Sequence, residues 1–173
     1  VNNAGWYLNY GAAPQTGGVM PFSQLNLLKN IIATSDTITT TQATLRFGHE
    51  VCVMPLACLL ELGNCGVVVN ELNKLDEQWR NYRILPMASN IQIIFYRPKK
   101  SLNNKQSTLN NDDVLVKVLL NENEVTLPAE TTMFPYYKWS DVREYYLEKL
   151  KKLPKSPFPN MPQQSPQIPS YIL

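Results

Sequence analysis

Leu45-Arg46-Phe47-Gly48-His49-Glu50 is the most informative run in this chain of 173 residues. It closes a short apolar-rich segment at residues 43–47, which predicts a strand, and it precedes an apolar segment at residues 55–62, which predicts a buried helix. His49 and Glu50 would therefore lie just after a strand and just before a helix. Open α/β sheets bind their ligands at such a place, so this is the first candidate site.

The residue types after the predicted strand suit phosphate chemistry. A helix start offers unpaired N–H groups and the positive end of the helix dipole, and Gly48 would let a ligand approach the backbone closely. His49 could donate a hydrogen bond to a phosphoryl oxygen. A carboxyl such as that of Glu50 can protonate a departing alcohol oxygen if burial or a neighbouring anion keeps part of it protonated. A structural His–Glu pair without catalysis fits the same dipeptide, so both interpretations stay open.

Arg46 alternates with two apolar neighbours in this run. The alternation predicts that its side chain points away from the side on which Leu45 and Phe47 pack, as a surface or supporting arginine. The aromatic cluster of Phe134, Tyr136, Tyr137 and Trp139 is interpreted as packing, and Lys99 and Lys100 as a solvated turn.

The second half of the chain reads as an antiparallel meander. Runs rich in β-branched and aromatic residues predict strands at residues 91–96 and 114–120, and a turn at 121–124 leads into a strand at 125–127. A final amphipathic helix, with Ser140 as its cap, would bury a face made of Val142, Tyr145, Tyr146, Leu150 and Leu153 and would carry a Glu148–Lys152 pair.

The first half is less regular. Residues 1–20 predict an irregular segment anchored by aromatic rings, and Ser23 is expected to cap a helix with a Leu25, Leu28 and Ile32 stripe that is broken from residue 34. The stretch from residue 72 to 82 does not predict one type of secondary structure. Prolines crowd the sequence after residue 153, which predicts an extended tail at residues 154–173.

Composition excludes several classes of protein. The net charge is only +2 and 44% of the residues are hydrophobic, which argues against nucleic-acid binding through a basic surface and against wholesale disorder. A membrane span needs about 20 mainly apolar residues, and the longest apolar run stops far short of that. One histidine and three cysteines, Cys52, Cys58 and Cys65, lack the spacing of a metal or redox site, so no metal and no cofactor is expected.

The run at residues 45–50, followed by Met54-Pro55-Leu56, resembles the C-terminal active-site motif of histidine acid phosphatases, in the branch that includes phytases and multiple inositol polyphosphate phosphatases. Residues 115–122 with Leu127-Pro128 are similar to that family's late strands, and Pro135-Tyr136-Tyr137 to its last helix entry. The resemblance implies an α/β fold with a mixed sheet flanked by helices, here the C-terminal half, over residues 1–153.

The family's mechanism gives the two site residues their roles. The resemblance implies that His49 contacts the phosphate and that Glu50, at a position usually held by Asp, is the proton donor. The nucleophilic histidine of the family lies in an N-terminal Arg-His-Gly motif that this sequence lacks. We therefore expect the chain to hydrolyse phosphate monoesters, with inositol phosphates among the candidates, only as part of a larger protein, and to be inactive alone.

Partners and location follow from the same resemblance. We expect unpaired strand edges to be covered by the N-terminal half of the same protein or by self-association, with no membrane span and no nucleic acid. The resemblance implies a periplasmic or secreted protein. The alternative is a noncatalytic module that binds phosphate or mediates protein contacts.

Overall fold

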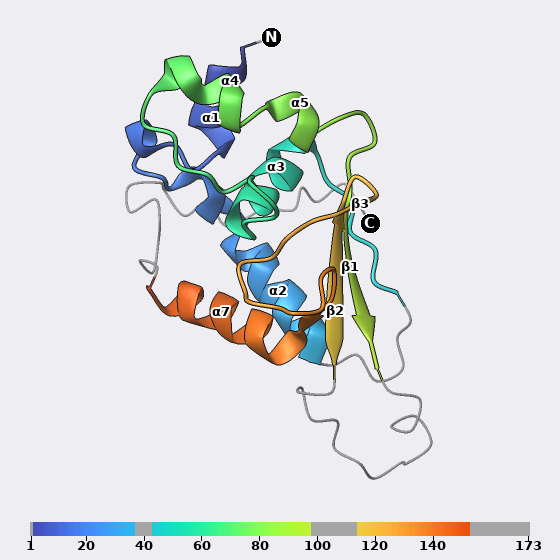
Figure 1. The fold of residues 1–173 in the computed structure, drawn as a ribbon. Helices are drawn as coiled ribbons and strands as arrows, with labels where there is room; N and C mark the ends of the chain where they lie inside the picture. The colour runs from blue at the N-terminus through green and yellow to red at the C-terminus, as the bar shows by residue number, and fades with distance from the viewer. Residues whose placement is uncertain (1, 37–42, 98–113, 153–173) are drawn as a thin grey trace, which may run out of the picture.

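The computed structural model describes residues 2–36, 43–97 and 114–152. Helices flank an antiparallel sheet, which confirms the predicted α/β class (Figure 1). The predicted tail at residues 154–173 and the Lys99-Lys100 turn lie outside the described residues. None of the helices in the described ranges is both long enough and apolar enough to cross a membrane.

The sheet is built around its second strand. β1 (Ile91–Tyr96) pairs antiparallel with β2 (Leu115–Leu120), and two short strands, β3 (Asn123–Glu124) and β4 (Tyr137–Lys138), also pair with β2. The first two strands lie where the sequence predicts them. The third was predicted at residues 125–127 but pairs two residues earlier, because Asn121 and Glu122 adopt positive φ angles of 51° and 66° and close a two-residue hairpin turn.

Alternation along β2 divides the sheet into two faces. Val116, Val118 and Leu120 are buried, whereas Leu115, Lys117 and Leu119 are only partly covered. The buried side chains share one core with Leu28 and Ile32 of α2 (Leu25–Asp36) and with Val142 and Tyr146 of α7 (Trp139–Lys152). Helices α2 and α7 therefore cover this face of the sheet (Figure 1).

The cap and boundary predictions for these two helices are partly wrong. Ser23 lies inside the 3-10 helix η2 (Met20–Gln24), which leads directly into α2, and α2 continues past residue 34 to Asp36. Ser140 lies inside the first turn of α7, and Glu148 pairs with Lys151 rather than Lys152. Of the predicted α7 face, Val142 and Tyr146 are buried and Tyr145 lies at its exposed margin, while Leu153 is outside the described residues.

A second group of short elements surrounds the N-terminal part of the core. These are α1 (Asn3–Tyr10), η1 (Pro14–Thr16), η3 (Leu72–Lys74), α4 (Leu75–Gln78) and α5 (Asn81–Ile84). The opening was predicted to be irregular, but Asn2 caps α1 by accepting a hydrogen bond from the Gly5 N–H, and Tyr7 is completely buried. The Tyr7 ring packs edge-on against Trp79, so tertiary packing overrides the weak helix propensity of this Asn- and Gly-containing segment.

The predicted strand at residues 43–47 is wrong. This segment forms no strand in the described structure, and Leu45 and Phe47 are 76% and 93% exposed. The buried helix that follows, α3 (Glu50–Leu59), begins five residues earlier than predicted and is buried from Met54 onward. An apolar run can form a strand only where another strand pairs with it, and no described strand does so here.

Candidate active site

His49 lies at the start of α3. It is the N-cap residue, with extended backbone angles of φ −92° and ψ 171°, and its side chain makes no capping hydrogen bond. Its carbonyl oxygen accepts hydrogen bonds from the N–H groups of Cys52 (2.9 Å) and Val53 (3.3 Å), which closes the first turn. The imidazole therefore does not cap the amides of that first turn, and within the described ranges no side chain is seen to bond them, so this positive end of the helix can receive an anion.

Glu50 occupies the first helical position beside His49, and both residues are exposed. The structure thus brings the two predicted site residues together at the outer end of a helix whose other end is buried. Burial of the Glu50 carboxyl, one of the two conditions given above for a proton donor, is not found among the described residues. Neither of the two hollows described below is lined by these two residues.

Arg46 attaches this region to α2. Its Nε and Nη2 atoms donate hydrogen bonds to Asn30 Oδ1 at 3.2 and 2.8 Å, and Nη2 also donates to Thr34 Oγ1 at 2.8 Å. The side chain therefore points toward α2 while Leu45 and Phe47 are exposed. The predicted packing of Leu45 and Phe47 is wrong, because both side chains are exposed among the described residues, and Arg46 is a surface arginine that contacts α2.

The contacts of Arg46 were not predicted from the sequence. Asn30 and Thr34 are four residues apart and hence lie on one face of α2. The helix was expected to break at residue 34, so the four-residue spacing of Asn30 and Thr34 was not recognised as helical. A helix predicted to continue to Asp36 would have placed the Asn30 and Thr34 side chains next to each other.

Gly48 makes no demanding contact. A Cβ atom at this position would lie 3.5 Å from Cys52 Cβ and 3.8 Å from Cys52 Sγ, which are ordinary van der Waals distances. Among the described residues, packing therefore does not require glycine here. The expected close approach of a ligand to this backbone stays a prediction.

The cysteines form no redox or metal centre in the described structure. All three are free; Cys58 and Cys65 are buried, and Cys52 is partly exposed. Burial raises the pKa of Cys58, and it raises the pKa of Cys65 to about 12. In the described ranges, no group of three or more His, Cys, Asp and Glu side chains is arranged to hold a metal ion.

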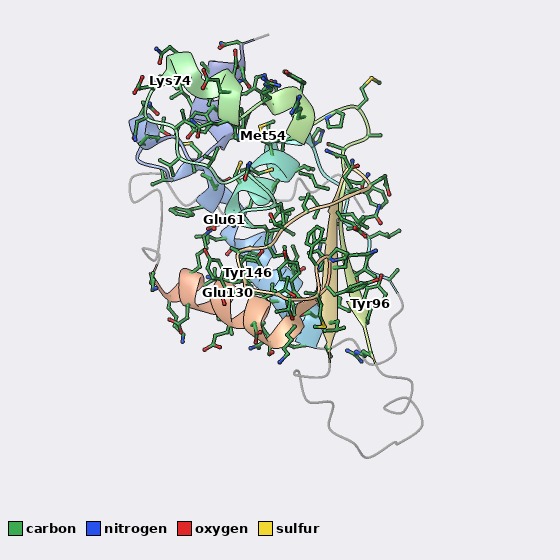
Figure 2. All side chains as sticks on the ribbon, in the orientation of Figure 1. Met54, Glu61, Lys74, Tyr96, Glu130 and Tyr146 are labelled. Carbon is green, nitrogen blue, oxygen red and sulfur yellow. The ribbon has the colours of Figure 1, made fainter. Side chains whose placement is uncertain are left out.

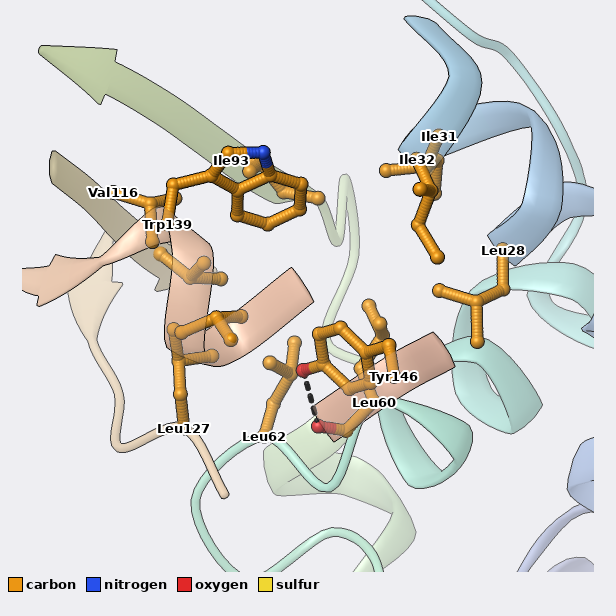
Figure 3. Close-up of a pocket in the computed structure, with 12 residues that line it drawn as sticks. Leu28, Ile31, Ile32, Leu60, Leu62, Ile93, Val116, Leu127, Trp139 and Tyr146 are labelled. Carbon is orange, nitrogen blue, oxygen red and sulfur yellow. Dashed lines mark hydrogen bonds between the residues drawn. The ribbon is translucent and has the colours of Figure 1, made fainter. Parts of the chain in front are cut away.

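Two hollows lie away from His49. One is a small apolar cavity of about 10 Å3 between α2, α7 and the sheet, lined in part by Leu28, Val116 and Trp139 (Figure 3). It is too small for a substrate. The other is an open hollow of about 310 Å3 beside Glu61, Asn64 and Thr126.

The carboxylate at the edge of the open hollow is already engaged. Glu61 follows the C-terminal end of α3 and contacts Lys149 Nζ and the Tyr145 hydroxyl, the latter at 2.9 Å. Figure 2 shows Glu61 and Tyr146 in the region between α3 and α7. These contacts fasten α7 to α3 and leave His49 and Glu50 as the best candidate for chemistry in the described chain.

Solved structures resemble this chain. It is similar to the multiple inositol polyphosphate phosphatase of Bifidobacterium longum in its apo form, with 23% identity and a TM-score of 0.60, over 78% of this chain and 28% of that one. The complexes of that enzyme with phosphate and with inositol hexasulfate give 22% and 24% identity, TM-scores of 0.63 and 0.60, and coverage of 86% and 87% of this chain and 31% of each.

These likenesses establish the fold. The chain has the helix-flanked α/β arrangement of part of a phosphatase and spans less than a third of the length of those phosphatase chains. No protein-family model matches the sequence, and no curated protein matches it either.

Proposed function

We propose that this chain is the part of a histidine-phosphatase-like phosphomonoester hydrolase that binds phosphate and protonates the leaving group. In this proposal His49 contacts the phosphate and Glu50 is the proton donor. The proposal is carried by one observation: in a chain similar in fold to a phosphatase, an imidazole and a carboxyl stand exposed and adjacent at one helix N-terminus.

The chemistry follows from the local geometry. The first-turn amides of α3 and the His49 imidazole can donate hydrogen bonds to phosphoryl oxygens, and charge-assisted bonds of this kind are among the strong ones. A bound phosphate would place negative charge next to Glu50, and a neighbouring anion favours the protonated form of a carboxyl. Glu50 could then transfer its proton to the departing alcohol oxygen, which is general acid catalysis.

Inositol phosphates are the substrate class that we favour. The support is the similarity to an enzyme whose name states that it acts on inositol polyphosphates, together with the motif resemblance at residues 45–50. By the same resemblance we propose a periplasmic or secreted location.

Titration with inorganic phosphate, followed by NMR of the amides at residues 48–52, tests the binding role. We expect His49→Ala to weaken phosphate binding about tenfold, because a hydrogen bond to a charged group contributes about 1.5–3 kcal/mol. Glu50→Gln should bind phosphate at least as well as the unchanged chain, because it removes a like charge. Glu77→Gln is the matched control, since Glu77 also lies in the first turn of a helix. Phosphate shifts that survive His49→Ala unchanged would contradict the assignment.

Turnover needs more than this chain offers. A phosphohistidine mechanism uses one histidine as nucleophile and another as phosphate ligand, and the sequence contains only His49. We expect no hydrolysis of p-nitrophenyl phosphate or phytate at acid pH by the chain alone. Hydrolysis that disappears in His49→Ala would contradict this expectation.

The missing chemistry implies a partner. We propose that the N-terminal half of the same protein, or failing that a second copy of this chain, covers Leu45 and Phe47. These large apolar side chains are both exposed, two residues apart, in a segment that no described strand pairs. A protein of this kind in which the partner supplies no histidine would be a noncatalytic phosphate-binding module.

Light scattering tests the partner proposal on the chain alone. We expect concentration-dependent association, reduced in Leu45→Ser/Phe47→Ser. Met87→Ser is the control, since Met87 is an apolar side chain 97% exposed elsewhere on the chain. A monodisperse monomer at all concentrations would argue against self-association.

A further inference from the structure

The segment that leads into α3 has an unusual attachment. Among the described residues, the backbone of residues 43–48 makes no hydrogen bond to another element, and its large apolar side chains are exposed. The Arg46 guanidinium, by contrast, makes three hydrogen bonds to α2. One side chain therefore supplies the polar contacts that hold this segment to the rest of the described structure.

Helix α2, which accepts the hydrogen bonds from Arg46, is itself packed against the rest of the structure. Leu28 is completely buried and Ile32 is 4% exposed, so the inner face of α2 is part of the core. At its C-terminal end, Asp36 accepts two hydrogen bonds from Arg143 of α7, at 2.8 and 2.7 Å. Asn30 and Thr34 thus present their oxygens from a helix that is packed on the core and bonded to α7.

The chemistry of the contact favours arginine over lysine. The guanidinium is a planar group with donors in fixed directions, so it can bond Asn30 and Thr34 at once and restrict both the place and the orientation of the backbone that carries it. A lysine ammonium on a flexible stem would restrict neither to the same degree. His49 follows only three residues later.

We infer that Arg46 is a positioning residue, which holds residues 43–49 on α2 and so determines where the His49 imidazole stands relative to a bound phosphate. The phosphate part of this inference rests on the proposed function. The attachment itself rests only on the contacts of Arg46 with Asn30 and Thr34.

Backbone 15N relaxation of the whole chain tests the attachment without any ligand. We expect the order parameters of residues 45–49 to fall from about 0.85 to below about 0.6 in Arg46→Ala and in Asn30→Ala. The double variant should be no more mobile than Arg46→Ala, because Arg46→Ala already removes every contact that Asn30→Ala removes. Arg46→Lys should restore part of the order, and Arg83→Ala, at an exposed arginine of α5, is the control.

Titration of the same variants with inorganic phosphate completes the test. We expect the phosphate affinity to fall by a similar factor in Arg46→Ala, Asn30→Ala and the double variant. Order parameters that do not change in Arg46→Ala would overturn the inference. So would a loss of phosphate binding in Arg46→Ala that Asn30→Ala does not share, since Arg46 would then bind phosphate itself. If the unchanged chain binds no phosphate, the proposed function fails, and the relaxation data still decide whether Arg46 holds the segment.

Discussion

The hydroxyl of Tyr146 donates a hydrogen bond of 2.8 Å to the carbonyl oxygen of Leu60, and this bond joins the middle of α7 to the C-terminal end of α3 (Figure 3). Tyr146 is 4% exposed and Leu60 is 2% exposed, so both partners of the bond are removed from water. Because α3 carries His49 at its opposite end, the contact helps to fix the helix on which the candidate site stands.

Loss of this hydroxyl should weaken the fold measurably. Tyr146→Phe keeps the ring but leaves the buried Leu60 carbonyl without its partner, which costs about 1–3 kcal/mol of unfolding free energy. Urea unfolding followed by circular dichroism measures the change. Tyr82→Phe, at a side chain 56% exposed, is the control and should be neutral. An equal effect of the two substitutions would mean that the Tyr146–Leu60 bond does not stabilise the fold.

Glu61 ends α3 in a conformation that usually belongs to glycine. Its φ angle is 55°, and the N–H groups of Glu61 and Leu62 bond the carbonyls of Cys58 and Ala57, the pattern of a Schellman motif. The ion pair with Lys149 and the hydrogen bond from the Tyr145 hydroxyl stabilise the Glu61 side chain in this position.

The left-handed backbone at Glu61 predicts an unusual order of stability. Glu61→Ala and Glu61→Gly lose the same contacts, but alanine keeps the strain of a left-handed residue, so Glu61→Gly should be more stable by about 1 kcal/mol. Glu71, with φ −104°, provides the opposite case, and there glycine should be the less stable of the two. The comparison uses urea midpoints of the four variants. If the alanine variant were the more stable of the two at both positions, the explanation of Glu61 by its left-handed backbone would be wrong.

Local patterns predicted the parts of the fold that they physically determine. The strands at residues 91–96 and 115–120 carry their own signal, because β-branched residues alternate along them and they pair with each other. The segment at residues 43–47 is also rich in apolar residues, but it has no described partner strand. Strand propensity depends on the residues of one segment, whereas a strand forms only when a second strand pairs with it. The sequence of the first segment does not show whether that second strand is present.

In the candidate site too, the local sequence predicts some contacts and not others. His49 and Glu50 are adjacent in the sequence, so any helix that begins after Gly48 brings them together. Arg46 and Asn30 are 16 residues apart and meet only because of how α2 and the following segment fold. The turn after Leu120 was predicted at its observed place but two residues too long, since neither Asn121 nor Glu122 is the glycine that usually marks a two-residue turn.

Tyr145 should make the stability depend on pH in the alkaline range. Burial, and then the hydrogen bond to the Glu61 carboxylate, raise its pKa to about 12 from an ordinary value of 10.0. A pKa raised in the folded state means that the folded protein favours the protonated phenol. This contribution to stability is therefore complete below pH 10 and is lost as the pH rises through about 12.

Two titrations check this assignment. The ultraviolet absorbance of tyrosinate should show a late-ionising component that moves to lower pH in Glu61→Gln, which removes the neighbouring charge. Unfolding free energies between pH 10 and 12 should fall less steeply in Tyr145→Phe than in the unchanged chain. Identical slopes in both proteins would show that Tyr145 does not contribute.

The three cysteines should differ sharply in reactivity. Cys52, in the first part of α3, is partly exposed, whereas Cys58 and Cys65 are 3% and 5% exposed and burial raises the pKa of both thiols. The thiolate is the reactive species, so a thiol reagent such as DTNB at neutral pH should modify one thiol quickly and the other two only when the chain unfolds. Cys52→Ser should abolish the fast phase. A fast phase that survives this substitution would mean that the core around Cys58 and Cys65 opens far more often than its packing implies.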